Sequence, residues 1–167
     1  LLKPNLLSPR EPSDAVSTHP EVVRAVATRI LSWEPARVWL GDSCAGDHCD
    51  EQLWTRTGMR EVAADTGIVL KSFRNCRAVP RRVAEHQVPV PAWLEEVDVV
   101  ISLPKLKTHA LTGMTCAVKN TYGLVMGAAK SSYHAKFPSP RRMSRFLAQV
   151  HHELEPDFFV VDAVEAL

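Results

Sequence analysis

The sequence has few of the short motifs that assign a function directly. Neither the phosphate-binding pattern GxxxxGK[ST] nor the dinucleotide pattern GxGxxG occurs, so the common glycine-rich nucleotide loops are excluded. No apolar run approaches about 18 residues, so we expect no transmembrane helix and no membrane partner. The net charge is +1, and basic residues are not interleaved with aromatic ones, which argues against a nucleic-acid partner.

Cysteine is also scarce, and its spacing is informative. The four cysteines include no CxxC pair, although zinc and iron–sulfur sites normally use such close spacings. Cys44 and Cys49 are separated by four residues, with Asp47, His48 and Asp50 around them. We favour reduced thiols in a cytoplasmic protein, with a metal or cluster site and a disulfide as alternatives. We therefore assign no metal ligand and identify no cofactor from these residues.

The amino-acid composition is typical of a single soluble globular domain. Of the 167 residues, 46% are hydrophobic and 23% are charged, which fits a single domain over residues 1–167. The chain starts at Leu1 without an initiator Met and stops soon after the apolar segment 158–162. We predict that the domain is truncated at both ends.

Alternating helix and strand signals predict an α/β fold. Thr18 to Glu21 has the form of a capping box with a proline in the first turn, so a helix is expected from there to about Trp33. Pro4 should end the first strand or place it at a sheet edge. Further strands are expected over 37–42, 68–71, 97–103 and 158–162, a short strand pair within 72–90, helices over 50–57, 60–65, 114–124 and 139–153, and a loop over 125–138. This order predicts a mainly parallel or mixed sheet flanked by helices on both faces.

A dense set of polar side chains follows the expected strand 97–103. The segment 105–108 would leave the carboxyl end of that strand, and Thr112 would cap the next helix, at a place where anions are commonly bound. We expect a pocket for a small anionic ligand, a phosphate, a carboxylate or an anionic cofactor. The alternatives are a solvated loop of lysines or a contact with a partner. The candidate catalytic residues are Lys105, His109 and Lys119, and the candidate ligand-binding residues are Asn5, Asp42, Lys107, Thr108, Thr112, Thr115 and Asn120.

Individual residues in this set have more than one interpretation. His109 is either a structural hydrogen-bond donor or an acid, base or metal ligand. His19 lies beside the expected helix cap, which favours a structural role. Asp42 and Asp162 each end an expected strand, where they would form an acid/base pair, bind a hard metal ion or cap the following turn.

Several sequence blocks resemble one family. The blocks Lys3-Pro-Asn-Leu, Thr18-His-Pro-Glu-Val-Val, Gly41-Asp-Ser and Leu103-Pro-Lys-Leu-Lys-Thr-His, together with Met114 to Gly123, are similar to the family catalogued as domain of unknown function 362. The resemblance implies a cytoplasmic prokaryotic protein, often fused at its C-terminus to a ferredoxin-like module with two four-iron clusters. The cysteine runs of that module are absent from this sequence. An iron–sulfur role therefore cannot be assigned to these residues from their own motifs, and the resemblance implies clusters only as a feature of fused, full-length members.

Three functions follow from these expectations. The first is a domain of an iron–sulfur-associated redox protein, which holds an anionic substrate or cofactor and receives electrons from a ferredoxin-like module in cis or in trans. The second is a non-redox enzyme on a carboxylate or phosphate substrate, with Lys105 or Lys119 stabilising charge and His109 carrying a proton. The third is a non-catalytic binding or assembly domain. Whether the chain is an enzyme stays open at this point.

Overall fold

The fold is built on a parallel sheet of five strands. The computed structural model describes residues 1–42 and 50–166. The sheet has the order β3-β2-β1-β6-β9, and all of its strand pairs are parallel. Its strands are β1 (Leu2–Pro4), β2 (Trp39–Asp42), β3 (Val69–Ser72), β6 (Ile101–Leu103) and β9 (Phe158–Phe159). Two hairpins lie outside the sheet, β4 (Ala78–Val83) with β5 (His86–Pro91) and β7 (Lys107–His109) with β8 (Gly113–Thr115).

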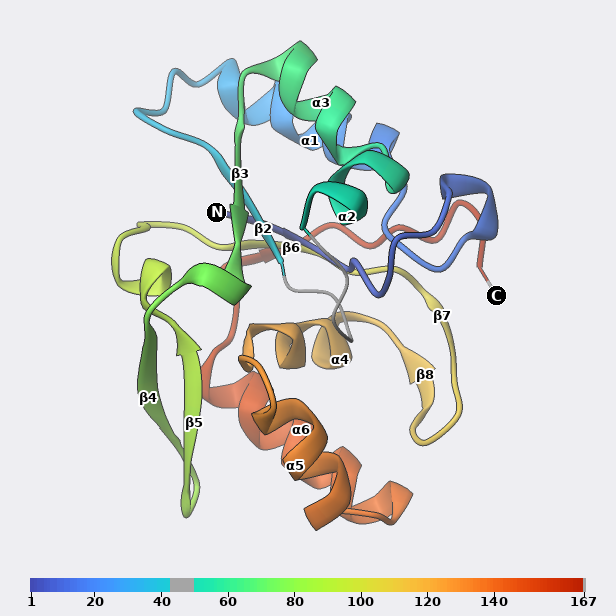
Figure 1. The fold of residues 1–167 in the computed structure, drawn as a ribbon, viewed down its shortest axis with the longest axis vertical. Helices are drawn as coiled ribbons and strands as arrows, with labels where there is room; N and C mark the ends of the chain where they lie inside the picture. Colours follow the sequence, from blue (N-terminus) through green and yellow to red (C-terminus); the bar gives the residue numbers. More distant parts are fainter. Residues whose placement is uncertain (43–49, 167) are drawn as a thin grey trace.

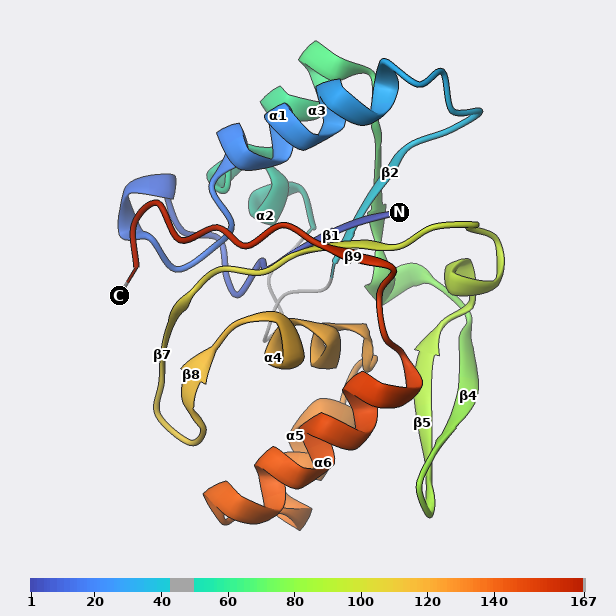
Figure 2. The same ribbon diagram turned by 180° about the vertical axis from the view of Figure 1, so that it is seen from behind.

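Helices lie on both sides of this sheet. Figures 1 and 2 show α1, α2 and α3 on one side and α4, α5 and α6 on the other. Their bounds are α1 (Pro20–Leu31), α2 (Asp50–Arg56), α3 (Met59–Thr66), α4 (Ala117–Thr121), α5 (Ala129–Lys136) and α6 (Pro140–Glu153). The predicted α/β class, with a parallel sheet flanked by helices on both faces, is confirmed.

Two hydrophobic clusters hold these layers together. The first cluster joins the sheet to α1, α2 and α3 and includes Leu2, Leu40, Val23 and Met59. The second joins the β4–β5 hairpin to α6 and includes Val88 and Phe146 with their neighbours. Because α6 alternates buried Met143, Phe146, Leu147 and Val150 with exposed polar residues, its apolar face was recognisable from helical spacing.

The first strand occupies the centre of the sheet. β1 pairs with β2 on one side and with β6 on the other, so the strand does not lie at an edge. Pro4 is its last residue, where the missing amide donor interrupts little of the ladder. The expected end of the strand at proline is therefore confirmed.

Several local predictions are wrong. The predicted helix 114–124 begins as strand β8, and α4 starts after Cys116, so Thr112 caps no helix. The predicted loop 125–138 contains α5. His19, and not Thr18, is the N-cap of α1, and its ring Nδ1 accepts from the amide of Glu21 at 3.2 Å. The Thr18 hydroxyl instead donates to the carbonyl oxygen of Leu103 at 2.6 Å, which ties α1 to strand β6.

Candidate functional site

The carboxyl ends of the central strands converge where the chain direction across the sheet reverses. β1 has β2 on one side and the much later β6 on the other. In open α/β sheets this reversal point is the usual place for a ligand. Here the position beside β1 is filled by the protein's own charged and polar side chains.

A buried ion pair lies at this point. The Lys3 ammonium donates to Oδ1 of Asp42 at 2.9 Å, and the two side chains are 0% and 3% exposed. Lys3 also donates to the carbonyl of Pro4 at 2.8 Å, and Oδ2 of Asp42 accepts from the Leu6 amide at 2.8 Å. Both charges are thus hydrogen-bonded as well as paired, which a buried pair requires.

Asn120 closes the same network from helix α4. Its Oδ1 accepts from Lys3 at 3.3 Å, and its amide nitrogen donates to the Lys3 carbonyl at 3.2 Å and to the Ser102 hydroxyl at 2.9 Å. A methyl group added at Gly123 would lie 2.6 Å from the Lys3 nitrogen. Glycine at this position therefore lets the chain after α4 approach the lysine closely.

A second buried ion pair lies one strand away. Lys105 donates to Oδ2 of Asp162 at 3.0 Å, and the two side chains are 2% and 0% exposed. The same carboxylate oxygen accepts from the His19 amide at 2.8 Å. Asp162, which follows β9 by three residues, thereby joins this part of the chain to the start of α1, and Lys105 neutralises its charge.

These contacts give several predicted site residues structural partners. Asp42, Lys105 and Asn120 each complete a buried network, so they are poorly placed to bind an external ligand. Asn5 directly follows β1, and its Oδ1 is buried without a hydrogen-bond partner among the described residues. Asp42 and Asp162 form two separate lysine pairs rather than a joint acid/base or metal pair.

The β7–β8 hairpin divides the remaining candidates between its two faces. Lys107 lies opposite Thr115, and His109 lies opposite Gly113, so these side chains share one face. Lys107 and Thr115 are buried, whereas Thr108 and its partner Met114 are exposed on the other face. The alternation therefore brings Lys107, His109 and Thr115 to the inner side of the hairpin and turns Thr108 outward.

Lys107 is an inward-facing cation. Its ammonium donates to the carbonyl of Val16. Burial, together with the positive charges of Lys119 and Lys105, lowers the pKa of Lys107 to about 8, although Asp42 acts in the opposite direction. A lysine in this environment exchanges its proton close to neutral pH.

Two further ionisable side chains complete the group. Burial and the charge of Lys3 lower the pKa of Lys119, whose nitrogen lies 5.2 Å from the centre of the Tyr122 ring. Burial and the charge of Lys119 lower the pKa of His134, on α5. We call Lys107, His109, Lys119 and His134 the lysine–histidine cluster.

His109 is held with one ring nitrogen facing its own loop. Nδ1 lies 3.2 Å from the amide nitrogens of Leu111 and Thr112 and 3.1 Å from the Thr112 hydroxyl. Because backbone amides only donate, Nδ1 is the acceptor and Nε2 carries the proton. Burial and the charges of Lys119, His134 and Lys107 lower the pKa of His109. The ring is therefore a neutral donor through Nε2, and Thr112 positions it.

The lysines of the cluster have no acidic partner among the described residues, and a hydroxyl next to them has no hydrogen-bond partner there. Within the described part of the chain, no carboxylate lies within 4.0 Å of the ammonium groups of Lys107 or Lys119. The Thr115 hydroxyl is buried and has no hydrogen-bond partner among the same residues. An anion at this place would meet unneutralised cations and an unused donor.

Sequence reasoning missed Lys3 and His134. Lys3 stands inside the short apolar strand Leu2–Pro4, and a lysine within a central strand is itself a signal because strands buried on both faces are normally apolar. His134 lies in the segment expected to be a loop, and no sequence pattern connects it with Lys119.

Among the described residues, no group of three or more His, Cys, Asp or Glu side chains could hold a metal ion. Cys76 and Cys116 are free thiols. The alternative involving Cys44 and Cys49 falls on residues 43–49, which lie outside the described ranges.

Among residues 1–42 and 50–166, no helix has the length and apolar character needed to cross a membrane.

Comparison with known proteins confirms the family that the sequence blocks resemble. Residues 1–167 match the model of the family described as Domain of unknown function (DUF362). A thylakoid-associated protein from Synechocystis sp. is 31% identical to this chain over 167 residues. The match covers 99% of this chain and 51% of that protein, so the chain spans about half the length of this curated relative.

Proposed function

The chain belongs to the DUF362 family, and we propose that its α/β domain binds a small carboxylate- or phosphate-bearing ligand at the lysine–histidine cluster. The observation that carries the proposal is geometric: Lys107 and His109 share one face of the β7–β8 hairpin. The Lys119 nitrogen and the centre of the His134 ring lie 5.2 and 5.6 Å from the centre of the Tyr122 ring. No carboxylate pairs with either lysine in the described ranges.

An anion would be stabilised at this cluster because neighbouring buried cations repel one another. The lowered pKa values of Lys107 and Lys119 express this cost, since burial and neighbouring positive charge both disfavour the ammonium form. A bound anion would replace repulsion by attraction and would restore the charged form. The Thr115 hydroxyl and the Nε2 proton of His109 would add neutral donors to the same ligand.

Lys105 is not part of this proposal. Its ammonium is paired with Asp162 and is buried, so Lys107 takes the place that the sequence suggested for Lys105. In this version Lys107 and Lys119 provide the charge, and His109 donates a hydrogen bond.

A redox role is the form of this function that the family resemblance suggests. In this role, the iron–sulfur clusters of a ferredoxin-like module, in cis or in trans, would reduce the ligand that is bound at the lysine–histidine cluster. The full-length gene provides the test: cysteine-rich runs after Leu167 and a brown cluster absorbance in anaerobically purified protein would support it. A complete reading frame that ends shortly after Leu167 without further cysteines would refute the fused form and leave only a module on a separate chain.

Non-redox catalysis is the second candidate, and the environment of Lys107 favours it. A pKa of about 8 lets this amine take up or release a proton near neutral pH. The group could therefore stabilise developing negative charge or transfer a proton to a carboxylate or phosphate substrate.

The cellular location is also a proposal. The relative from Synechocystis sp. is named as thylakoid-associated. For this chain we infer a cytoplasmic location from the family resemblance, and fractionation of cells that express the full-length gene tests it.

Binding at the cluster is tested by calorimetric titration with inorganic phosphate and with acetate. Replacing Lys119 by Met should weaken binding of the preferred anion by about 10- to 100-fold, because a charge-assisted hydrogen bond contributes about 1.5–3 kcal/mol. Lys71→Met is the matched control, because it removes the same charge at another place. Lys71 lies on edge strand β3, and its ammonium lies over the rings of Trp39 and Trp93. Equal weakening by both variants would show a general charge effect and would refute the proposed site.

A further inference from the structure

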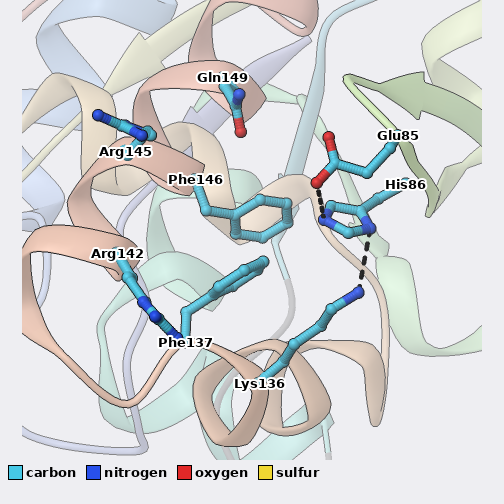
Figure 3. Close-up of a pocket in the computed structure, with 8 residues that line it drawn as sticks. All are labelled: Glu85, His86, Lys136, Phe137, Arg142, Arg145, Phe146 and Gln149. Carbon is cyan, nitrogen blue, oxygen red and sulfur yellow. Dashed lines mark hydrogen bonds and ion pairs between the residues drawn. The ribbon is translucent and has the colours of Figure 1, made fainter.

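A hollow between the β4–β5 hairpin, α5 and α6 shares no residue with the lysine–histidine cluster. Its volume is about 510 Å³, which is within the range of small-molecule sites. Figure 3 shows the rings of Phe137 and Phe146 at its centre, with His86 and Lys136 to one side and Arg142 to the other. Arg145 and Gln149 contribute from the next turns of α6, and Glu85 lies beside His86.

Flat rings form the floor and one wall of this hollow. The ring centres of Phe137 and Phe146 are 4.7 Å apart, and that of His86 is 5.7 Å from Phe137 and 5.6 Å from Phe146. The His86 ring is oriented from both ends, because Nε2 lies 3.2 Å from Oε1 of Glu85 and Nδ1 lies 3.2 Å from the Lys136 nitrogen. A ring held in this way offers a fixed surface to an aromatic ligand.

The other wall is strongly basic. A smaller adjoining hollow of about 250 Å³ is lined by Arg141, Arg142 and Arg145, and the last two line both hollows. In the described part of the chain, none of these three guanidinium groups is within 4.0 Å of a carboxylate. Six other arginines do have such a partner, at positions 24, 56, 60, 74, 77 and 81.

This arrangement is slightly unfavourable for the unliganded protein, because the three guanidinium groups are exposed and solvent screens their repulsion. Arg145 is three and four residues after Arg142 and Arg141 on one helix, which brings like charges together on one face. An anion would neutralise them, and guanidinium groups bind phosphate through paired hydrogen bonds.

We propose that this hollow is a second binding site, for an anion that carries a flat aromatic ring, a ligand of the mononucleotide class. The ring packs on Phe137 and His86, where stacking on a base is favourable. The phosphate lies toward Arg142 and Arg145, at the junction of the two hollows.

The test uses AMP as the probe and its two halves as controls, each titrated into the purified chain by calorimetry. AMP is expected to bind at least about tenfold more tightly than adenosine or ribose 5-phosphate, since it alone uses both walls. If ribose 5-phosphate binds as tightly as AMP, the ring plays no part and the proposal is wrong. If none of the three binds at millimolar concentration, the proposal is also wrong.

Variants locate the binding. Arg142→Gln combined with Arg145→Gln should weaken AMP binding by about a hundredfold, or about tenfold per guanidinium. Arg10→Gln combined with Arg37→Gln removes the same charge at arginines that line neither hollow, and it should leave the affinity within about twofold. Equal losses in the two double variants would overturn the proposal.

A third variant separates the ring from the charge. Phe137→Leu keeps an apolar side chain but removes the flat surface, so AMP should lose about tenfold in affinity while ribose 5-phosphate is unchanged. Because Phe137 also packs against Tyr133 and Phe146, a melting curve must first show that the variant is folded. Because AMP carries a phosphate, the titrations are repeated in a Lys119→Met background, where the losses caused by the Arg142→Gln and Arg145→Gln pair and by Phe137→Leu should persist, so failure at this hollow and failure at the lysine–histidine cluster are distinguishable.

Discussion

Replacing Lys3 by Met should destabilise the fold strongly, although the new side chain is apolar and similar in length. The variant removes the Lys3 cation from the buried carboxylate of Asp42, whose Oδ2 keeps its contact with the Leu6 amide. It also removes the donor to Oδ1 of Asn120. Removing one partner of a buried, hydrogen-bonded pair costs about 3–5 kcal/mol. In a chain of this size each kcal/mol corresponds to about 2–4 °C, so we expect a fall in melting temperature of roughly 6–20 °C.

The assay is urea unfolding followed by circular dichroism, with a double-mutant cycle as the control. Lys3→Met combined with Asp42→Asn should recover part of the loss, because no unpaired charge is left buried. Arg24→Met breaks an exposed pair with Asp65 and should cost less than about 1 kcal/mol. A Lys3→Met cost as small as that of Arg24→Met would refute the interpretation of the Lys3 network as a buried structural element.

Three further predictions concern the same edge of the sheet. Gly123→Ala should cost about 1–3 kcal/mol, because the added methyl group lies 2.6 Å from the Lys3 nitrogen, which is fixed by its three partners; an unchanged urea midpoint would contradict this. Thr115→Val removes a buried hydroxyl that has no partner among the described residues, so stability should stay level or rise by up to about 1 kcal/mol while phosphate affinity falls; unchanged affinity would exclude Thr115 from the site. The stability of the ligand-free protein should increase as pH rises from about 8 toward 10.5, because over that interval the unfolded chain keeps a proton on Lys107 that the folded chain has released. Lys107→Met should lack this increase in pH-dependent unfolding measurements, and an identical pH profile in both proteins would contradict the assigned environment.

Much of the fold followed from the sequence because local signals and burial agreed. The apolar face of α6 at helical spacing and the glycine that ends α3 were sufficient for those elements, and Gly67 does take the left-handed conformation with φ at 77°. The β7–β8 hairpin was not predicted, because residues 107–115 have no alternating apolar pattern and their pairing depends on inward-facing Lys107 and Thr115. Gly113, with φ at 76°, allows the turn between these strands, a role that no pattern in the neighbouring residues predicts.

The sequence singled out the Leu103 to Gly123 segment but not the partners of its side chains. Within that segment, Lys107, His109 and Thr115 share one face of the β7–β8 hairpin, and burial together with the charge of Lys119 lowers the pKa of Lys107 and of His109. What the sequence could not show is which lysines are already neutralised. Lys105 meets Asp162, 57 residues later in the chain, and Asn120 meets Lys3, 117 residues earlier. Such distant pairings depend on strand order, which a single sequence does not specify.

The most direct test of the anion site is the pKa of Lys107 measured by nuclear magnetic resonance with and without inorganic phosphate. Signals of the lysine side chains, assigned with the Lys107→Met variant, would be followed from pH 6 to pH 11. We predict that Lys107 titrates at about 8 in the free protein and at a higher pH when phosphate is bound, because the anion stabilises the ammonium form. Titration near the ordinary lysine value of about 10.4 in both samples would contradict the account.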